Sequence, residues 1–366
     1  MAESELELRP YRDPQDRPAF MELYRAIYGR PYGGTADADA AFAWMYREAG
    51  DGRLLATAAF AGEQMAAFYG IVPVRMRVDG KDMVAAQSLD SMTHPDFQRR
   101  GLFAKLGQLA YRETCHDIPL VFGFPNENAL PPRVMRLGWM LLRPVPRFGL
   151  ILREPPLPAR LHQPGVGAAV DAAMLGLQWR TRVAEWGAFG LSRLRHLRTE
   201  QEPGIPDDVD ELWQEVRDDY RVSVLRDRAY LTWRYDRHPS VKYTVFSVRE
   251  GRKLRGLLVL RLPEGEARDV MATEWLAPAA LDVQLAMAEK LASVTRRGRH
   301  RAAFVLNSFR RQDVAALLAL GFVPLPQGRG RMWLVPGVRA NTPEMPPETV
   351  CHIDHWRLSY GDMDVG

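Results

Sequence analysis

Apolar positions in the first third of the chain change from helical spacing to strand spacing. Pro14 to Tyr28 and Asp37 to Ala49 carry apolar side chains at helical intervals, after a short predicted strand at Leu6 to Tyr11. Three apolar or alternating runs follow, and Asp79-Gly80 between the last two is a strong hairpin signal. These runs are Leu54 to Ala61, Met65 to Val78 and Lys81 to Thr93. The pattern predicts two helices followed by an antiparallel meander.

A polar turn, His94 to Gly101, separates this meander from a predicted helix at Leu102 to Thr114. A short buried strand at Ile118 to Phe124 follows the helix. A second helix at Leu130 to Leu137 is closed by Gly138. The alternation of strands and helices predicts one α/β domain that ends near Arg153.

The same order of elements recurs later in the chain. A second three-strand meander is predicted between Val241 and Ala277, followed by a helix at Ala279 to Arg297 and a strand at Ala302 to Leu306. Pro95 and Gly138 are 43 positions apart, and so are Pro278 and Gly321. Chance similarity between two α/β domains is the alternative, but we favour a tandem duplication. We therefore predict two related α/β domains, each with a mixed, mostly antiparallel sheet flanked by helices.

Four segments follow from this division of the 366 residues, a length that suits two domains of ordinary size. Residues 1–153 form the first domain, and 154–206 form a proline-rich linker with amphipathic helices. Residues 207–340 form the second domain, and 341–366 form a C-terminal strand and an acidic tail. Packing between the domains explains the amphipathic pattern at Ala168 to Arg198, although a membrane-surface contact is a second interpretation.

Charge and cysteine content narrow the classes of partner. Lys and Arg number 49 against 45 Asp and Glu, so the net charge of +4 is too weak to argue for nucleic acid. Only Cys115 and Cys351 occur, which excludes a disulfide framework or a cysteine-rich metal site. The acidic N-terminus lacks the features of a secretory signal, and no run reaches about 20 apolar residues. We expect a cytoplasmic protein.

The segment Gln98-Arg99-Arg100-Gly101 is the main candidate for chemistry. It lies between a strand and a helix, where the backbone N–H groups of Leu102 and its neighbours are left without intrahelical partners and the helix dipole favours an anion. Gly101 lets phosphate oxygens approach the backbone, and Arg99 and Arg100 add positive charge. A surface turn with arginines is the alternative. The segment predicts a site for a pyrophosphate.

This order of elements, with Gln98 and Gly101 in the turn, resembles the GNAT superfamily of acyl-CoA-dependent N-acyltransferases. In that family the pattern is Gln or Arg, two residues, Gly, one residue, then Gly or Ala; here Phe103 occupies the last position and Ala104 follows it. The resemblance covers residues 5 to 150 and extends to 210 to 335 as a second domain. The second copy has Pro278-Ala279-Ala280 in place of the turn, so we expect it to be degenerate and to shape the substrate cleft.

The resemblance implies that acetyl-CoA, or another acyl-CoA, is the co-substrate, and that an amine of a small molecule attacks the thioester directly in a ternary complex. A backbone amide near Met92 or Thr93 would polarise the carbonyl. Asp90, on the same strand, is the expected base. The alternative role for Asp90 is to satisfy backbone donors at a strand bulge.

A tyrosine that often protonates the thiolate in this family is missing, since the corresponding stretch begins at Arg133. Tyr69 is the expected substitute, unless CoA leaves as the thiolate. Asn126 and Asn128 are candidates for contacts with the pantetheine arm or the substrate, and helix capping is their alternative role. The acidic tail from Ser359 to Gly366 is a minor candidate for supplying the base.

No metal is expected, because His352 and His355 lack further ligands nearby in sequence. Two other classes of function remain open. A non-catalytic acyl-CoA-binding or scaffold protein of the same fold is favoured by Phe103 and the missing tyrosine, and opposed by the intact turn. An aminoacyl transferase fed by charged tRNA is opposed by the modest net charge.

Overall fold

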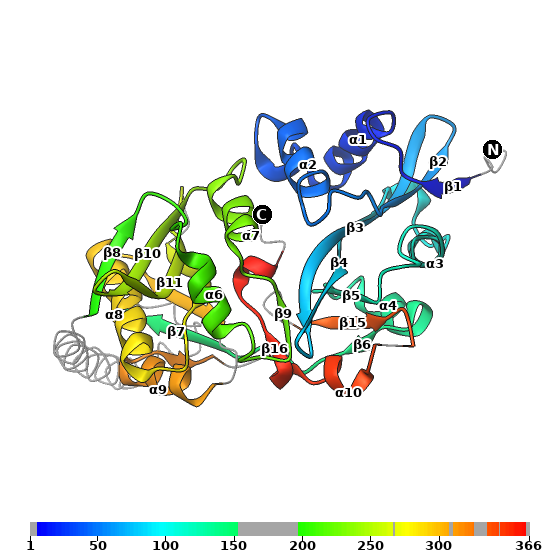
Figure 1. Cartoon of the computed structure of the whole chain (residues 1–366). Coiled ribbons are helices and arrows are strands. Elements are labelled where there is room, and N and C mark those ends of the chain that lie inside the picture. Colours follow the sequence, from blue (N-terminus) through cyan, green and yellow to red (C-terminus); the bar gives the residue numbers. More distant parts are fainter. Residues whose placement is uncertain are drawn as a thin grey trace, which may run out of the picture.

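The computed structural model describes residues 6–152, 197–265, 268–306, 310–325, 335–343 and 345–363. These residues form two halves, each a sheet flanked by helices (Figure 1). The predicted fold class, two α/β domains with mixed sheets, is confirmed. The helices predicted between Ala168 and Arg198 lie outside the described residues, apart from Leu197 and Arg198, which begin a strand.

The first half follows the predicted order of elements closely. Its strands are β1 (Glu7–Pro10), β2 (Thr57–Ala61), β3 (Gln64–Val78), β4 (Lys81–Thr93), β5 (Leu120–Gly123) and β6 (Met140–Leu141). Its helices are α1 (Arg17–Tyr28), α2 (Ala38–Tyr46), α3 (Leu102–Glu113) and α4 (Leu130–Leu137), with short 3-10 turns at Tyr32–Gly34 and Pro95–Phe97. The sequence therefore located each of these helices to within a few residues.

The second half repeats the pattern, with additional short elements. Its strands are β7 (Arg147–Ile151), β8 (Leu197–Glu202), β10 (Tyr243–Glu250), β11 (Lys253–Arg261), β12 (Asp269–Leu276), β13 (Ala302–Leu306) and β14 (Val323–Pro324). Its helices are α6 (Val209–Val216), α7 (Arg228–Leu231), α8 (Leu281–Arg297) and α9 (Arg311–Ala319), and a π-helical turn covers Thr232–Asp236. Four more elements connect the halves: β9 (Val222–Val224), β15 (Gly337–Ala340), α10 (Pro347–Val350) and β16 (Trp356–Arg357).

The two sheets have the same strand order, position by position. The first runs β1-β2-β3-β4-β5-β15-β6, and the second runs β8-β10-β11-β12-β13-β7-β14. Along each of these paths one pair of strands is parallel, β4 with β5 and β12 with β13. These two pairs occupy equivalent positions in their sheets. The equivalence supports the internal repeat that the sequence predicted.

The halves exchange one strand each. β7 follows the first half in sequence but inserts between β13 and β14 of the second sheet, where Phe148 pairs with Val305. β15 follows the second half in sequence but inserts between β5 and β6 of the first sheet, where Val338 pairs with Phe122. Sheet membership therefore does not follow chain order, and each half depends on a strand supplied by the other.

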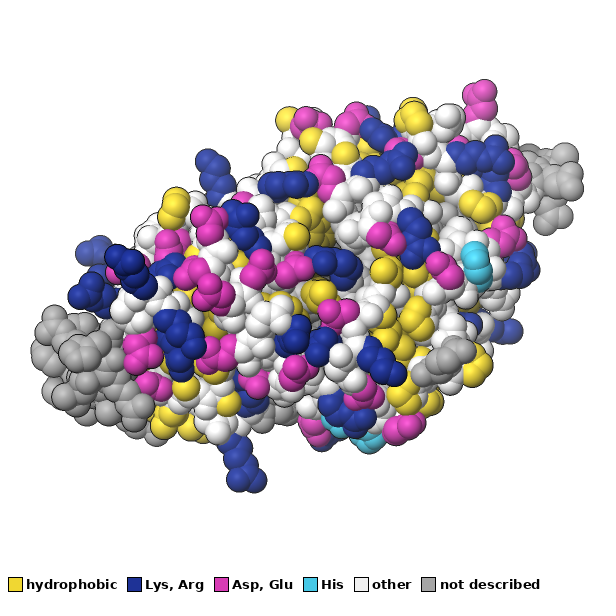
Figure 2. Space-filling model, viewed as in Figure 1, with side chains coloured by type: hydrophobic (Ala, Val, Ile, Leu, Met, Phe, Trp, Pro, Cys, Tyr) yellow, Lys and Arg dark blue, Asp and Glu magenta, His cyan; other side chains and the backbone are white. Residues whose placement is uncertain are grey.

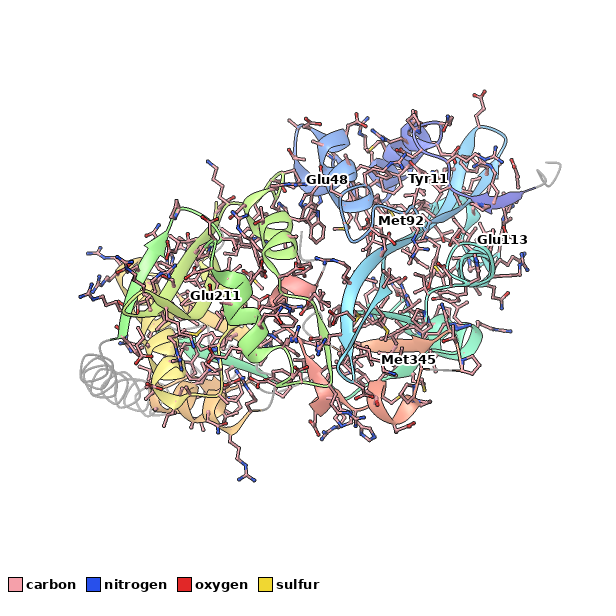
Figure 3. The ribbon with its side chains drawn as sticks, in the orientation of Figure 1. Tyr11, Glu48, Met92, Glu113, Glu211 and Met345 are labelled. Carbon is pink, nitrogen blue, oxygen red and sulfur yellow. The ribbon has the colours of Figure 1, made fainter. Side chains whose placement is uncertain are left out.

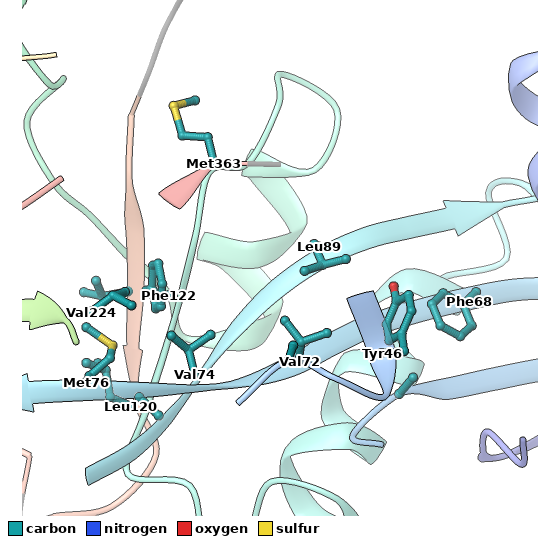
Figure 4. Close-up of a cluster of buried hydrophobic side chains, with 14 of the residues drawn as sticks. Tyr46, Phe68, Val72, Val74, Met76, Leu89, Leu120, Phe122, Val224 and Met363 are labelled. Atoms are coloured by element: carbon teal, nitrogen blue, oxygen red, sulfur yellow. The ribbon is translucent and has the colours of Figure 1, made fainter. Parts of the chain in front are cut away.

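The C-terminal segment passes between the two halves (Figure 1). β16 pairs with β9, and β9 extends the first sheet along β3. Trp356 is buried against Phe122, with ring centroids 5.7 Å apart. The core of the first half accordingly includes side chains from β3, β4, β9 and the C-terminal segment, among them Met363 (Figure 4).

Charged side chains of both signs are intermingled over the face shown in Figure 2. Glu48, labelled in Figure 3, lies just after α2. It forms an ion pair with Arg237 of the second half. Among the described residues, no helix combines the length and apolar character needed to cross a membrane.

Candidate functional site

β4 and β5 are paired over a short stretch and then separate. Their parallel register covers Ala86 with Val121 and Gln87 with Phe122. Gly123 ends β5 at a close approach, since a Cβ there would be 2.7 Å from the Ser88 carbonyl oxygen. Beyond this point lies a cavity of about 290 Å³, which we call the splay cavity. It is lined by Tyr28, Gln87, Ser88, Leu89, Asp90, Ser91, Phe124, Pro125, Asn126, Ala129, Arg133 and Met363.

Asp90 occupies a bulge in β4. The register between β3 and β4 shifts between Phe68 and Gly70, and Asp90 has a left-handed φ of 45°. A residue other than glycine adopts this backbone conformation at a cost in free energy. Bulges of this kind often redirect a side chain next to a functional site. Asp90 Oδ2 accepts hydrogen bonds from the hydroxyls of Tyr32 at 2.7 Å and Tyr46 at 2.9 Å. The bulge and these two donors fix the direction of the carboxylate.

A second cavity, of about 220 Å³, lies on the other side of Asp90. We call it the aromatic cavity, because four of its lining side chains are Tyr or Trp. It is lined by Tyr24, Tyr28, Arg30, Tyr32, Gly33, Ala41, Trp44, Met45, Asp90, His238, Pro239 and Ser240. Asp90 and Tyr28 line both cavities. The Asp90 carboxylate therefore lies at the boundary between them.

His238 brings a neutral polar group from the second half to the aromatic cavity. Burial, together with Arg234 and Arg261, lowers the pKa of His238 to about 3. Its Nδ1 accepts from the backbone N–H of Ser240 at 3.2 Å and of Val241 at 3.1 Å. Because Nδ1 is the acceptor in the neutral ring, Nε2 carries the proton. His238 is thus an uncharged hydrogen-bond donor at neutral pH.

The predicted phosphate turn has an open backbone. Gly101 has φ of 71° just before α3, and a Cβ there would contact nothing within 4 Å. Lys105 is the first residue of α3 whose N–H bonds back to the turn, at the Gly101 carbonyl. In the described part of the chain, the N–H groups of residues 102–104 have no hydrogen-bond acceptor. Arg99 and Arg100 are exposed beside them.

Several sequence-predicted residues lie outside the splay cavity. Met92 and Thr93 pair with β3 and do not line the splay cavity. The residues of β4 that line the cavity are Gln87 to Ser91. Phe103 packs its ring against Tyr69, with centroids 5.3 Å apart. Phe103 therefore does not cover the phosphate turn with its side chain.

The remaining candidates divide in the same way. Tyr69 is fully buried and lines neither cavity. Asn126 lines the splay cavity, and its Oδ1 also accepts from the N–H groups of Asn128 and Ala129, which is the capping role considered from the sequence. Asn128 is exposed and lines neither cavity.

Sequence reasoning missed Arg133, Trp44, His238 and the tyrosines around Asp90 as members of the site. Arg133 had one signal, since it occupies the helix where the family's tyrosine was expected. The aromatic residues had no such signal, because their role depends on how α1, α2 and the second half fold around the β4 bulge.

The equivalent place in the second sheet is filled. The cavity beyond the paired stretch of β12 and β13 measures only about 10 Å³ within the described residues. Arg357 from β16 lines it and donates to the Trp275 carbonyl oxygen at 2.6 Å and to Glu274 at 2.9 Å. The C-terminal segment thus occupies the space that remains open in the first half.

Metal-ligating side chains do not gather in the described ranges, where no group of three or more His, Cys, Asp or Glu residues has a geometry that could hold an ion. His352 and His355 have ring centroids 5.3 Å apart, and His355 Nδ1 is 2.8 Å from the Thr349 carbonyl oxygen.

Comparison with known proteins identifies the first half. Residues 7–142 match the family model described as an acetyltransferase (GNAT) domain. No curated protein sequence matches the chain.

Solved structures of low sequence identity share the fold of nearly the whole chain. A GCN5-related N-acetyltransferase from Anabaena variabilis aligns with a TM-score of 0.59 at 10% identity, covering 92% of this chain and 73% of its own. One from Kribbella flavida aligns at 0.58 and 15% identity, covering 92% and 72%. A protein of unknown function from Enterococcus faecalis, described as a probable N-acyltransferase, aligns at 0.61 and 11% identity, covering 92% and 73%. Residues 7–142 therefore form a GNAT acetyltransferase domain, and a second domain of the same strand order follows it.

Proposed function

We propose that this protein is an N-acyltransferase that moves an acetyl or other short acyl group from acyl-CoA to the amine of a small molecule. The observation that carries the proposal is the position of Asp90 at the boundary between the splay cavity and the aromatic cavity. A carboxylate between two ligand-sized cavities can act as a general base. It can take a proton from a nucleophile bound in one cavity while that nucleophile attacks an electrophile bound in the other. Most of the residues that line the two cavities belong to the first domain.

The residues present fit an acyl-CoA. The turn before α3 offers open N–H groups, a glycine and two arginines for a pyrophosphate. The splay cavity offers the edge of β4 from Gln87 to Ser91, where backbone donors not used by β5 can bind amide and carbonyl oxygens. A thioester arm would run from the first feature to the second.

In this proposal the amine nitrogen attacks the thioester carbonyl carbon, and the carbon–sulfur bond breaks after the carbon–nitrogen bond forms. Asp90 accepts the proton that the attacking nitrogen loses, directly or through one water molecule. Backbone N–H groups on the open edge of β4 stabilise the negative charge on the carbonyl oxygen. No side chain needs to become acylated, so both substrates are bound together.

The aromatic cavity favours an acceptor with one amine and a compact apolar body. Tyr24, Tyr32 and Trp44 line the cavity with aromatic rings, whose faces can attract an ammonium group and whose surface can bury apolar groups. Among the described residues, Asp90 is the one carboxylate in its lining, and Arg30 adds positive charge. A polyamine would find too few carboxylates here, so we propose a monoamine.

Isothermal titration with acetyl-CoA tests the first half of the proposal. Gly101→Glu places a carboxylate beside the phosphate turn without a clash at Cβ, and we expect at least about a tenfold loss of affinity from like-charge repulsion. Gly251→Glu is a matched control, because Gly251 also has a left-handed φ, of 59°, and open space at its Cβ. Failure of the wild type to bind, or equal binding by both variants, contradicts the proposal.

Mass spectrometry of reactions with acetyl-CoA and a panel of amines tests the second half. We expect acetylated monoamines with an aromatic or branched alkyl body, and little product from polyamines. Binding of acetyl-CoA without any acetylated product would instead support the non-catalytic alternative.

A further inference from the structure

Arg133 is a buried cation whose surroundings are almost entirely uncharged. It lies on α4 with 3% of its surface exposed. Nη1 donates to the Tyr69 hydroxyl at 3.1 Å, and Nη2 donates to Ser91 Oγ at 3.3 Å. The guanidinium carbon lies 4.5 Å from the ring centroid of Trp139. Nε is buried and has no hydrogen-bond partner among the residues that the structure describes.

In the described part of the chain, no anionic side chain neutralises the positive charge of Arg133. No carboxylate of the described residues lies within ion-pair distance of its nitrogens, whereas the buried Arg226 and Arg357 each pair with a carboxylate. Guanidinium groups are not deprotonated in proteins. Two hydroxyls and aromatic faces offset part of the cost of burial, but a buried cation without an anion is costly. An anion that is present only in a bound state would complete the site.

The splay cavity is where that anion would lie, because Arg133 and its partner Ser91 both line it. In the proposed function, the turn before α3 binds the phosphates of CoA, at the other end of the thioester arm. The remaining anion of the proposed reaction is the sulfur that departs when the thioester breaks.

We infer that Arg133 is a catalytic residue that pairs with the CoA thiolate as it leaves. The inference rests on the proposed function. When the carbon–sulfur bond breaks, its electron pair goes to sulfur, and Arg133 stabilises this charge without transferring a proton. The amine proton goes to Asp90, and the thiolate acquires a proton from solvent after release. A separate acid is then unnecessary.

Tyr69 acts as a positioning residue in this scheme. Its hydroxyl accepts from Arg133 and lies 2.8 Å from the hydroxyl of Tyr111, which in turn accepts from Trp139 Nε1 at 2.8 Å. Burial raises the pKa of Tyr111 well above its ordinary value, so this hydroxyl stays protonated. The chain of hydrogen bonds holds the guanidinium at the wall of the cavity.

The test is a pH titration of the thiol of CoA bound to the protein. The ultraviolet absorbance of the thiolate monitors the titration. Arg133→Gln keeps donors for Tyr69 and Ser91 but removes the charge, and we expect the pKa of the bound thiol to rise by about one unit or more. We also expect kcat with acetyl-CoA to fall at least about tenfold, with the affinity for CoA changed less than about threefold. Arg136→Gln, on an exposed position of the same helix, is the control and should change neither.

Three results would overturn the inference while leaving the proposed function intact. The first is an equal thiol pKa in wild type and Arg133→Gln when both bind CoA. The second is a bound-thiol pKa in the wild type no lower than that of free CoA, a measurement that does not depend on a folded variant. The third is selective loss of turnover with a carboxyacyl-CoA such as succinyl-CoA, which would show that Arg133 binds the acyl carboxylate. Absence of acetyl-CoA binding by the wild type would instead reject the proposed function itself.

Discussion

Trp44 and Trp233 stack across the two halves of the molecule, with ring centroids 4.9 Å apart and planes 18° apart. Each indole also donates to the backbone carbonyl of the other residue, Trp44 Nε1 at 2.9 Å and Trp233 Nε1 at 3.0 Å. Trp44 lines the aromatic cavity and contacts the His238 ring. The pair therefore joins the halves at the wall of the proposed acceptor site.

Replacing Trp44 by Ala should affect both stability and acceptor binding. Loss of a buried Trp side chain is expected to cost about 3–5 kcal/mol in the free energy of unfolding. Trp233→Phe keeps a ring for stacking and loses one hydrogen bond, so a cost of about 1 kcal/mol is expected. Urea denaturation checks both values.

The KM for the amine should rise in Trp44→Ala while the affinity for acetyl-CoA stays unchanged, because Trp44 does not line the splay cavity.

Asp90→Asn should abolish most of the turnover without disturbing the backbone. Asn tolerates the left-handed conformation that Asp90 adopts, so the bulge is retained. Loss of a general base is expected to lower kcat by about 10²–10⁴ with little change in acetyl-CoA affinity. Steady-state kinetics and titration measure the two effects. Asp82→Asn, at the exposed start of the same strand, is the control, and equal rates in both variants would reject Asp90 as the base.

The elements of the first half could be predicted because their signals are local. β4 was predicted at Lys81 to Thr93 and α4 at Leu130 to Leu137, since a hairpin turn and a closing glycine mark their ends. The Asp90 prediction came from the family resemblance, because Asp90 lies on the strand before the predicted phosphate turn and could reach the cleft. Its position between two cavities supports that prediction without testing the chemistry.

The features that the sequence did not predict depend on contacts between distant segments. Nothing local to β7 or β15 shows that these strands change places between the sheets. The pairing of Trp44 with Trp233, 189 positions apart, has the same origin. Arg133 was noted as the absence of a tyrosine, and its significance came from its burial and from the lack of a nearby carboxylate.

Arg226 anchors the C-terminal segment to the second half through a buried ionic network. Its Nε lies 3.0 Å from Glu274, and its Nη2 lies 2.5 Å from Asp362. Arg226→Met removes the cation and leaves Asp362 without its partner, so a cost of about 3–5 kcal/mol is expected in thermal or urea unfolding. Arg228→Met, which breaks an exposed pair with Asp207, is the control and should cost less than about 1 kcal/mol.

Rescue distinguishes the ionic role from simple packing. Adding Asp362→Asn to Arg226→Met removes the unpaired charge, so the double variant should be more stable than Arg226→Met alone. A double variant that is as unstable as the sum of both single changes would mean that the two side chains act independently.

Truncation after Met363 tests whether the C-terminal tail supplies the base, and it keeps the buried Asp362 in place. Arg234 donates to the carbonyl oxygens of Gly361 and Met363, and Gln87 donates to that of Asp362. These contacts involve only residues that truncation keeps, and urea unfolding of the truncated protein is the control for stability. With Asp90 as the base, kcat should stay within about twofold of the wild type. A large loss of kcat with unchanged stability would favour a base supplied by the tail.

His238 should make the folded state sensitive to mild acid. Burial lowers its pKa to about 3, whereas an unfolded His has a pKa near 6.5, so the unfolded state binds the proton first as pH falls. The contribution of His238 to stability is therefore complete above about pH 6.5 and decreases as the pH falls toward 3, by about 2 kcal/mol between pH 7 and pH 5. In His238→Asn the amide oxygen can replace Nδ1 as acceptor for Ser240 and Val241, and this part of the pH dependence should disappear.

Urea unfolding at several pH values measures this pH dependence, with exposed His116→Asn as the control. The same pH dependence in His238→Asn and wild type would show that the ring is already protonated in the folded protein.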